Sequence, residues 1–306
     1  MVTRARAAGY ALFGTRFDYL LHLRPAEWPI MAAHTGVGYL LAEGLTAARA
    51  GRHLGAALAG LVLWVVCLNG GTLALNSAFD RDEGDVAYLR QPPPAPRGLA
   101  GFSLGLMVAG QLAACFLPLP FALAYAGCFV LSVLYSVPPF RLKAVAGADW
   151  VINMWGFGTL TPYAGWASTG VPVDPARGLV LLAFCPLFAA LYPLTQLYQL
   201  EEDRRRGDRT LASALGPERS LDVALVAAAI GFGLLGAGAV RAGWRLPGDG
   251  WRVAALGVAA LGWAVVLIPW RFRAKGLSPH EHQRGMYRAL AAWAVTDVAV
   301  VLGWGW

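Results

Sequence analysis

The sequence predicts an all-α polytopic membrane protein, and two observations support that prediction. The chain of 306 residues is 57% hydrophobic and only 14% charged, whereas a soluble domain normally carries about 25% charge. Several apolar stretches also reach the roughly 20 residues that a helix needs to cross a hydrocarbon core about 30 Å thick. These stretches lack the polar–apolar alternation of barrel strands, so we predict helices rather than a β-barrel.

About nine apolar segments are candidate transmembrane helices, and together they fill the chain. The Pro118–Pro120 turn separates the third and fourth segments so closely that we expect a tight helical hairpin there. No soluble domain interrupts the pattern, so residues 1–306 are predicted to form a single membrane-embedded domain. The segments are 27–47, 54–79, 98–117, 119–137, 147–169, 178–200, 219–240, 250–270 and 285–305.

The net charge of +7 reflects membrane topology rather than nucleic-acid binding, because the basic residues lie in short loops between apolar segments. All but six of the 25 Lys and Arg residues fall in the N-terminal segment, in the loops after even-numbered segments or at the start of the segments that follow those loops. By the positive-inside rule these loops face the cytoplasm, which predicts a protein of the bacterial inner membrane with its N-terminus inside and its C-terminus outside. The six are Arg49, Arg52, Arg177, Arg241, Arg245 and Arg252.

Two other groups of metal-ligating residue types are not expected to bind metal. The four cysteines lie within apolar segments and form no CxxC pair, so we predict buried core thiols without a disulfide or zinc site. His280 and His282 are predicted to be solvated side chains in the loop before the last segment. The cysteines are Cys67, Cys115, Cys128 and Cys185.

Acidic residues gather at the predicted cytoplasmic end of the second segment. Asn76 and Asp80 are four residues apart and therefore share one helical face. Asp85 falls off that face in a straight helix, but Gly84 allows the chain to turn and bring it back.

A similar group lies at the end of the sixth segment. Gln199 and Asp203 are again four residues apart, and Gly207 precedes a further aspartate, Asp208. One interpretation is that both groups are ordinary solvated loop charges. However, a helix C-terminus disfavours carboxylates, and carboxylates near membrane depth cost more still, so a bound cation explains them better.

Oxygen ligands at this density suit Mg²⁺, which commonly binds through one or two carboxylates together with substrate phosphates. Basic residues on the same side complete this chemistry, because a metal ion together with Arg and Lys neutralises a leaving pyrophosphate. Each basic residue has an alternative role as a topology anchor. They are Arg90, Arg97, Arg141, Lys143, Arg204, Arg205, Arg206 and Arg209.

Four segments carry motifs in a fixed order. They are Leu23-Arg24-Pro25 with Trp28; Asn76xxxAsp80 with Asp85; Tyr135-Ser-Val-Pro138-Pro139-Phe-Arg141-Leu-Lys143, followed by Asp149 and Gly156-Phe-Gly158; and Glu202-Asp203-Arg-Arg-Arg-Gly207-Asp208-Arg209-Thr210-Leu211 with Gly216. In this order they resemble the motifs of the UbiA-type intramembrane aromatic prenyltransferases, and the resemblance covers nearly the whole chain. One such motif is only suggestive, whereas four at the expected helix ends are highly specific.

The resemblance implies nine transmembrane helices around a central cavity that opens to lipid. It also implies Mg²⁺-dependent transfer of a prenyl group from a prenyl pyrophosphate to a lipophilic acceptor. Asn76, Asp80 and Asp203 are then expected to bind the metal or the pyrophosphate. The expected pyrophosphate partners are Arg24, Arg141 and Lys143.

The acceptor is left open, because the segment that begins at Tyr135 resembles chlorophyll-synthase-like and carotenoid-elongating branches as much as quinone-type branches. An aromatic ring, a polyene end or an alcohol would each fit. Tyr135 and Tyr198 are candidates to stabilise an allylic cation through their π faces, as is Phe79, with core packing as the alternative.

Two positions depart from the family pattern. Gly84 stands where the first motif usually has its second Asp, so Asp85 or Asp82 is expected to substitute for it. Gln199 stands where the second motif usually opens with Asp. The Gln199 carbonyl can still ligate Mg²⁺ but brings no charge, so Glu202 or Asp208 is expected to compensate, and reduced activity is the alternative.

A transporter or a non-catalytic scaffold is the alternative function for the same helices. Transporters often show internal repeats and helices broken at the midplane. The two acidic ends are weakly repeat-like, but the polar residues gather at one membrane face. That arrangement favours an enzyme cavity that is polar at one end.

Overall fold

The computed structural model describes residues 4–46, 51–80, 89 and 91–306, and no β-strand occurs among them. Six of its helical segments are long and apolar enough to cross a membrane. The all-α prediction is therefore confirmed for the described residues, and the chain is an integral multi-pass membrane protein. The six are Leu54–Asp80 (α5 to α6), Leu119–Ser136 (α8), Pro175–Gln196 (α11), Leu211–Arg241 (α13), Gly250–Gly276 (which begins with α14) and Pro279–Trp304 (α15).

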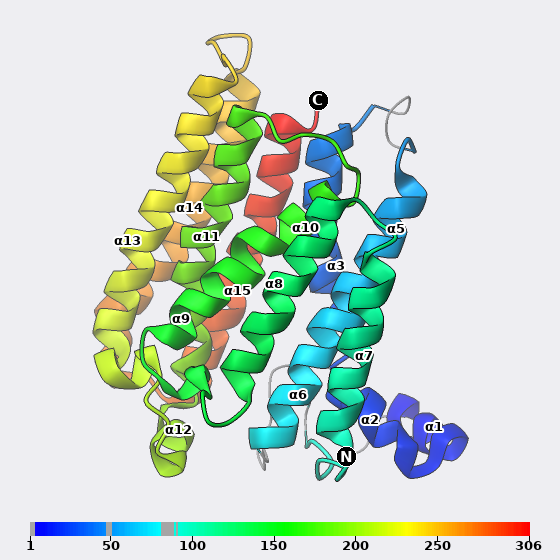
Figure 1. The fold of residues 1–306 in the computed structure, drawn as a ribbon. Helices are drawn as coiled ribbons and strands as arrows, with labels where there is room; N and C mark the ends of the chain where they lie inside the picture. The colour runs from blue at the N-terminus through cyan, green and yellow to red at the C-terminus, as the bar shows by residue number, and fades with distance from the viewer. Residues whose placement is uncertain (1–3, 47–50, 81–88, 90) are drawn as a thin grey trace.

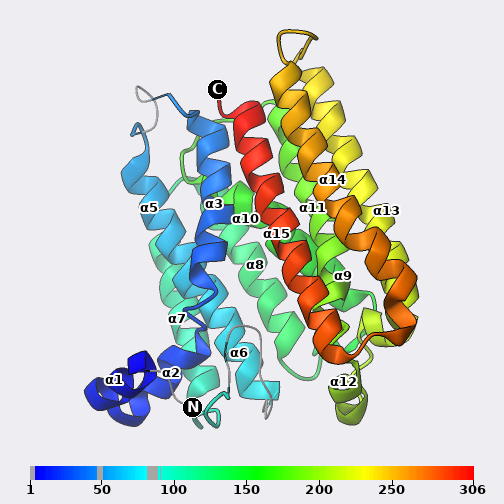
Figure 2. The ribbon, with the colours of Figure 1, turned by 180° about the vertical axis from the view of Figure 1, so that it is seen from behind.

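Shorter helices complete the bundle (Figure 1). Two segments contain an internal π-helix: Leu63–Gly70 joins α5 to α6, and Met154–Leu160 joins α9 to α10. Figures 1 and 2 both place the N-terminus, the end of α6 and α12 at one end of the bundle and the C-terminus at the other. The shorter helices are α1 (Arg4–Phe13), α2 (Phe17–His22), α3 (Trp28–Glu43), α5 (Leu54–Val62), α6 (Gly71–Asp80), α7 (Leu99–Ala114), α9 (Ala148–Asn153), α10 (Thr161–Ala167) and α12 (Leu200–Arg206).

Helices α3 and α10 cross with their backbones in direct contact. A Cβ atom at Gly38 would overlap the backbone of Pro162, and one at Gly165 would overlap the carbonyl of Thr35. Small residues permit this close approach between membrane helices. Helix α11 packs with α13 along a core that contains Phe184 and other fully buried residues. These contacts fix two walls of the cavity described below.

Two helices begin earlier than the sequence pattern predicts. Helix α13 begins at Leu211 rather than 219, because Thr210 caps a short helical turn before the non-helical residue Gly216. Helix α15 begins at Pro279 rather than 285, because Ser278 forms a capping box with Glu281.

This earlier start of α15 overturns the prediction for the two histidines. His280 and His282 lie in the first turn of the helix rather than in a loop. His282 is only 4% exposed and accepts a hydrogen bond from Trp270 Nε1 at 3.0 Å. The prediction of a solvated side chain is therefore wrong for His282, although it holds for the exposed His280.

All four cysteines are free, as predicted. Cys128 and Cys185 are buried, and Cys67 is partly buried. Cys115 is exposed at the end of α7, so the prediction of a buried core thiol is wrong at that position. An apolar helix in lipid buries only the face turned toward the protein, and hydropathy alone does not identify that face.

Candidate functional site

Helix α6 ends in a buried cluster of polar groups. Lys143 Nζ donates a hydrogen bond to Asn76 Oδ1 at 2.8 Å and forms an ion pair with Asp80. The side chains of Asp80 and Lys143 are each 8% exposed. Asn76 and Asp80 therefore face the same partner, as their spacing predicts, and a cation compensates for the carboxylate at the C-terminus of the helix.

Arg141 connects the two acidic motifs. Its Nη1 atom donates to Asp208 Oδ1 at 2.6 Å, and its Nη2 atom donates to Asp80 Oδ1 at 3.4 Å. Arg141 has a φ angle of 37° and Arg24 one of 50°, a left-handed conformation that is costly for residues other than glycine. Such backbone strain is often found at functional sites. Two of the three expected pyrophosphate partners are thus held in strained conformations.

The second acidic motif does not extend the sixth membrane helix as the sequence suggested. Helix α11 ends at Gln196, and Gln199 is the N-cap of the separate helix α12. Asp203 Oδ2 accepts a hydrogen bond from Thr210 Oγ1 at 3.2 Å, whereas Gln199 Nε2 donates to Tyr198. Of these acidic residues, Asp208 is the one that meets Arg141.

Part of the predicted metal site lies outside the described residues, namely Asp85 and its alternative Asp82. Within the described part of the chain, no three Asp, Glu, His or Cys residues gather closely enough to form a metal cluster. The candidate oxygen ligands in that part are divided between the two motifs, with Arg141 between Asp80 and Asp208 and Lys143 beside Asp80.

Asp149 supports the second motif, a role that the sequence analysis did not assign. This residue is fully buried, and its Oδ2 accepts hydrogen bonds from Gln196 Nε2 at 2.8 Å and from the Leu211 amide at 3.0 Å. Gln196 Oε1 in turn accepts from the Ala212 amide at 3.2 Å. Asp149 thus ties the end of α11 to the start of α13 and holds both ends of the segment that carries Asp203 and Asp208.

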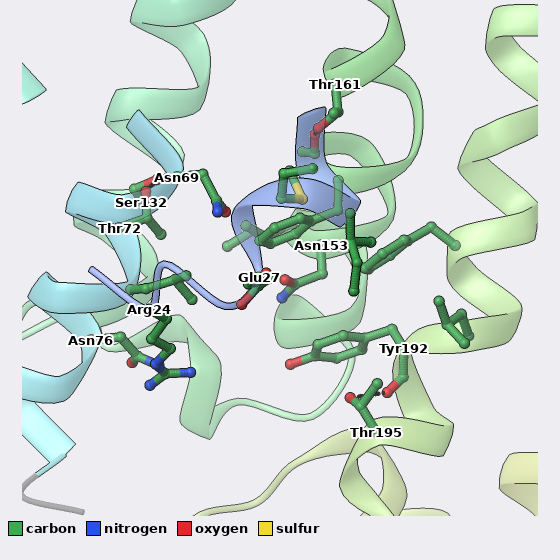
Figure 3. Close-up of a pocket in the computed structure, with 18 of the residues that line it drawn as sticks. Arg24, Glu27, Asn69, Thr72, Asn76, Ser132, Asn153, Thr161, Tyr192 and Thr195 are labelled. Carbon is green, nitrogen blue, oxygen red and sulfur yellow. Dashed lines mark hydrogen bonds between the residues drawn. The ribbon is translucent and has the colours of Figure 1, made fainter. Parts of the chain in front are cut away.

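A cavity of about 280 Å³ extends from this polar end into the bundle (Figure 3). Most of its lining is apolar or aromatic. Tyr135 and Tyr198 line it, and the Tyr135 hydroxyl lies 2.9 Å from that of Tyr192. Phe79 is not among the lining residues. Arg24 also lines the cavity and donates to Ser77 Oγ at 3.2 Å, which places its guanidinium beside α6.

Polar residues also line the cavity beyond this end, and the sequence analysis missed them. Asn69, in the π-helical segment, is 5% exposed, and neither of its amide atoms has a hydrogen-bond partner among the described residues. Thr72 and Ser132 pair through their hydroxyls at 2.7 Å. Glu27, directly before α3, adds a carboxylate (Figure 3). The asparagine within an apolar run was the only signal that could have revealed this group.

Comparison with known proteins agrees with this geometry. The model of the UbiA prenyltransferase family matches residues 32–288. The chain belongs to the UbiA prenyltransferase family. It is therefore a prenyltransferase, and its curated relatives point the same way.

Two curated relatives are both named lycopene elongase/hydratase. The protein from Halobacterium salinarum is 31% identical over 156 residues, which is 48% of this chain and 54% of the relative, so the chain spans about half of that relative's length. The protein from Haloferax volcanii is 29% identical over 68% of each chain.

A solved structure of a UbiA homolog from Archaeoglobus fulgidus, bound to GPP and Mg²⁺, has the same fold. It superposes with a TM-score of 0.65 at 22% identity and covers 93% of this chain and 99% of its own.

Proposed function

We propose that this UbiA-family enzyme transfers a prenyl group from a prenyl pyrophosphate to a lipophilic acceptor within the membrane, releases pyrophosphate and depends on Mg²⁺. The observation that carries the proposal is the bridge that Arg141 forms between Asp80 of the first motif and Asp208 of the second. Asn76, which shares its partner Lys143 with Asp80, lines the adjacent apolar cavity. The homolog bound to GPP and Mg²⁺ supports it.

The oxygen ligands of the two motifs fit a magnesium ion. Carboxylate and amide oxygens are the protein ligands that Mg²⁺ prefers when phosphate oxygens complete its coordination. When bound, the ion supplies positive charge to the pyrophosphate oxygens. We assign the binding of this Mg²⁺ ion to Asn76, Asp80, Asp203 and Asp208, together with Asp85, which lies outside the described residues.

The remaining residues bind and orient the donor. Lys143, Arg141 and Arg24 bind the pyrophosphate oxygens, so that the electron pair of the C1–O bond is stabilised as it moves onto the leaving group. Gln199 and Tyr198 complete the binding site at this end. The aromatic face of Tyr135 stabilises the allylic cation, and the apolar walls exclude water that would capture it.

The bundle crosses the membrane nine times in this proposal, and its cavity opens laterally to lipid. Figure 1 supports this topology, because the N-terminus, the end of α6 and α12 lie at one end of the bundle and the C-terminus lies at the other. The excess of Lys and Arg on that side assigns it to the cytoplasm, so we place the enzyme in the plasma membrane. The segments are α3, α5 to α6, α7, α8, α9 to α10, α11, α13, α14 and α15.

The acceptor that we favour is a polyene end, since the two relatives are named for lycopene.

The proposed function is tested with purified protein in detergent. The protein is incubated with Mg²⁺ and with geranylgeranyl or dimethylallyl pyrophosphate as the donor. Lycopene, a hydroxynaphthoic acid and a tetrapyrrole alcohol are supplied in turn as the acceptor. We expect lycopene to gain a prenyl unit by mass spectrometry, with one pyrophosphate released per product. Prenylation of another acceptor would correct the acceptor class, and an unchanged donor in every mixture would favour a transporter or scaffold.

A further inference from the structure

Prenyl transfer to a polyene leaves one proton that a base must remove. The donor C1–O bond breaks with its electron pair on pyrophosphate, and the terminal alkene of the acceptor supplies the pair that forms the new C–C bond. The positive charge then lies on the neighbouring carbon of the acceptor. Breaking an adjacent C–H bond restores the alkene and releases H⁺, so the cavity needs a proton acceptor.

Glu27 is the only carboxylate among the described residues that line the cavity. It precedes α3 directly and is half-buried, and Figure 3 shows its carboxylate directed toward the interior. Its side chain forms no hydrogen bond or ion pair with another described residue. The aspartates at the polar end differ, because Asp80 and Asp208 are held by Arg141 and Lys143.

We propose that Glu27 is the proton acceptor of the transfer reaction, a role that rests on the proposed function. In this step the Glu27 carboxylate takes the C–H proton of the acceptor cation and becomes a carboxylic acid. The C–H electron pair forms the new double bond. Glu27 then returns the proton to solvent before the next turnover.

The surroundings of Glu27 are suited to this task. Desolvation by the cavity walls raises the pKa of Glu27 to about 7, with the positive charge of Arg24 opposing the shift. A base with a pKa near the working pH is ionised often enough to act and still holds the proton that it takes. The other titratable groups that line the cavity ordinarily have pKa values above about 8. They are Arg24 between α2 and α3, Cys128 and Tyr135 on α8, Tyr192 on α11, Tyr198 before α12, and Tyr287 on α15.

The test compares two products of one reaction. Wild type, Glu27→Gln and Glu27→Asp are incubated with dimethylallyl pyrophosphate, Mg²⁺ and lycopene, and pyrophosphate release and prenylated lycopene are both quantified. Glu218→Gln serves as the matched control, because Glu218 pairs with Arg271 and Lys275 away from the cavity.

We expect Glu27→Gln to lower formation of the alkene product by about 10²-fold or more, while pyrophosphate release falls far less. Water then captures the cation, so alcohols replace the alkene product. Glu27→Asp is expected to recover part of the alkene product, and Glu218→Gln to match wild type.

Three outcomes would overturn the assignment. An unchanged ratio of alkene to pyrophosphate in Glu27→Gln shows that another group takes the proton. An equal loss of both products, with no recovery in Glu27→Asp, shows a structural role. Absence of pyrophosphate release in wild type overturns the proposed function itself, and the role of Glu27 with it.

Discussion

The polar end of the cavity and its interior differ in whether their charged and polar side chains are paired with other side chains. At the polar end, Asp80 and Asp208 are paired with Arg141 and Lys143. In the interior, the side chains of Glu27 and Asn69 have no hydrogen-bond partner among the described residues. Burying an unpartnered polar group costs free energy, and a bound ligand can offset that cost. The comparison indicates that the polar end is organised for the departing anion and the interior for the acceptor.

Removing a carboxylate from the polar end is expected to have the largest effect. Asp80→Ala takes away a proposed metal ligand and removes the ion pair between Asp80 and Lys143, so pyrophosphate release should fall by about 10³-fold or more. Steady-state release from geranylgeranyl pyrophosphate measures this. Asp222→Asn, an exposed aspartate on α13, is the control and should keep wild-type activity. Near-normal turnover in Asp80→Ala would overturn the metal assignment.

Arg141→Gln removes the guanidinium that joins the two motifs, and we expect a loss of about 10²-fold in pyrophosphate release. Arg271 offers a matched control, because it also bridges two carboxylates, Glu218 and Asp222, but away from the cavity. Equal effects of Arg141→Gln and Arg271→Gln on activity would remove Arg141 from the site.

The pH dependence of stability tests the interior. The pKa of Glu27 is raised to about 7 from an ordinary value near 4.5. Between these values the folded state keeps a proton that the unfolded state releases, so this residue makes wild type less stable as pH rises through that window. Glu27→Gln lacks the effect, and its gain in Tm over wild type should grow from about pH 5 to about pH 8. A constant difference would show that the Glu27 pKa is not raised.

Asn69→Leu is expected to have the smallest effect and to act in opposite directions on stability and function. Replacing a buried amide without partners should raise the free energy of unfolding by about 1 kcal/mol. The KM for the acceptor should rise a few-fold, with pyrophosphate release almost unchanged. Thr72→Val is the control, because Thr72 is already paired with Ser132 and its loss should not stabilise the protein. A destabilised Asn69→Leu variant would contradict the comparison.

The sequence predicts the fold well where one physical signal dominates. Apolar length and the absence of strand alternation predict the membrane helices, and the spacing of Asn76 and Asp80 predicts their shared face. The pattern does not reveal the early starts of α13 and α15, because these depend on the caps at Thr210 and Ser278.

The functional site is only partly predictable from the sequence, because some of its contacts join helices that are distant along the chain. Lys143 and Arg141 were expected beside the acidic motifs because all of them lie on one side of the membrane. The support that Asp149 gives through Gln196, and the interior position of Asn69, depend on how distant helices pack. Helical spacing within one segment carries no information about such contacts.

The most direct test of the central claim is pyrophosphate release by wild type across a Mg²⁺ series, with geranylgeranyl pyrophosphate as the donor and EDTA as the metal-free condition. We expect release that saturates with both Mg²⁺ and donor and that stops in EDTA. Release that continues unchanged in EDTA, or a donor left intact at every Mg²⁺ concentration, would contradict the assignment of the two acidic motifs to metal-assisted prenyl transfer.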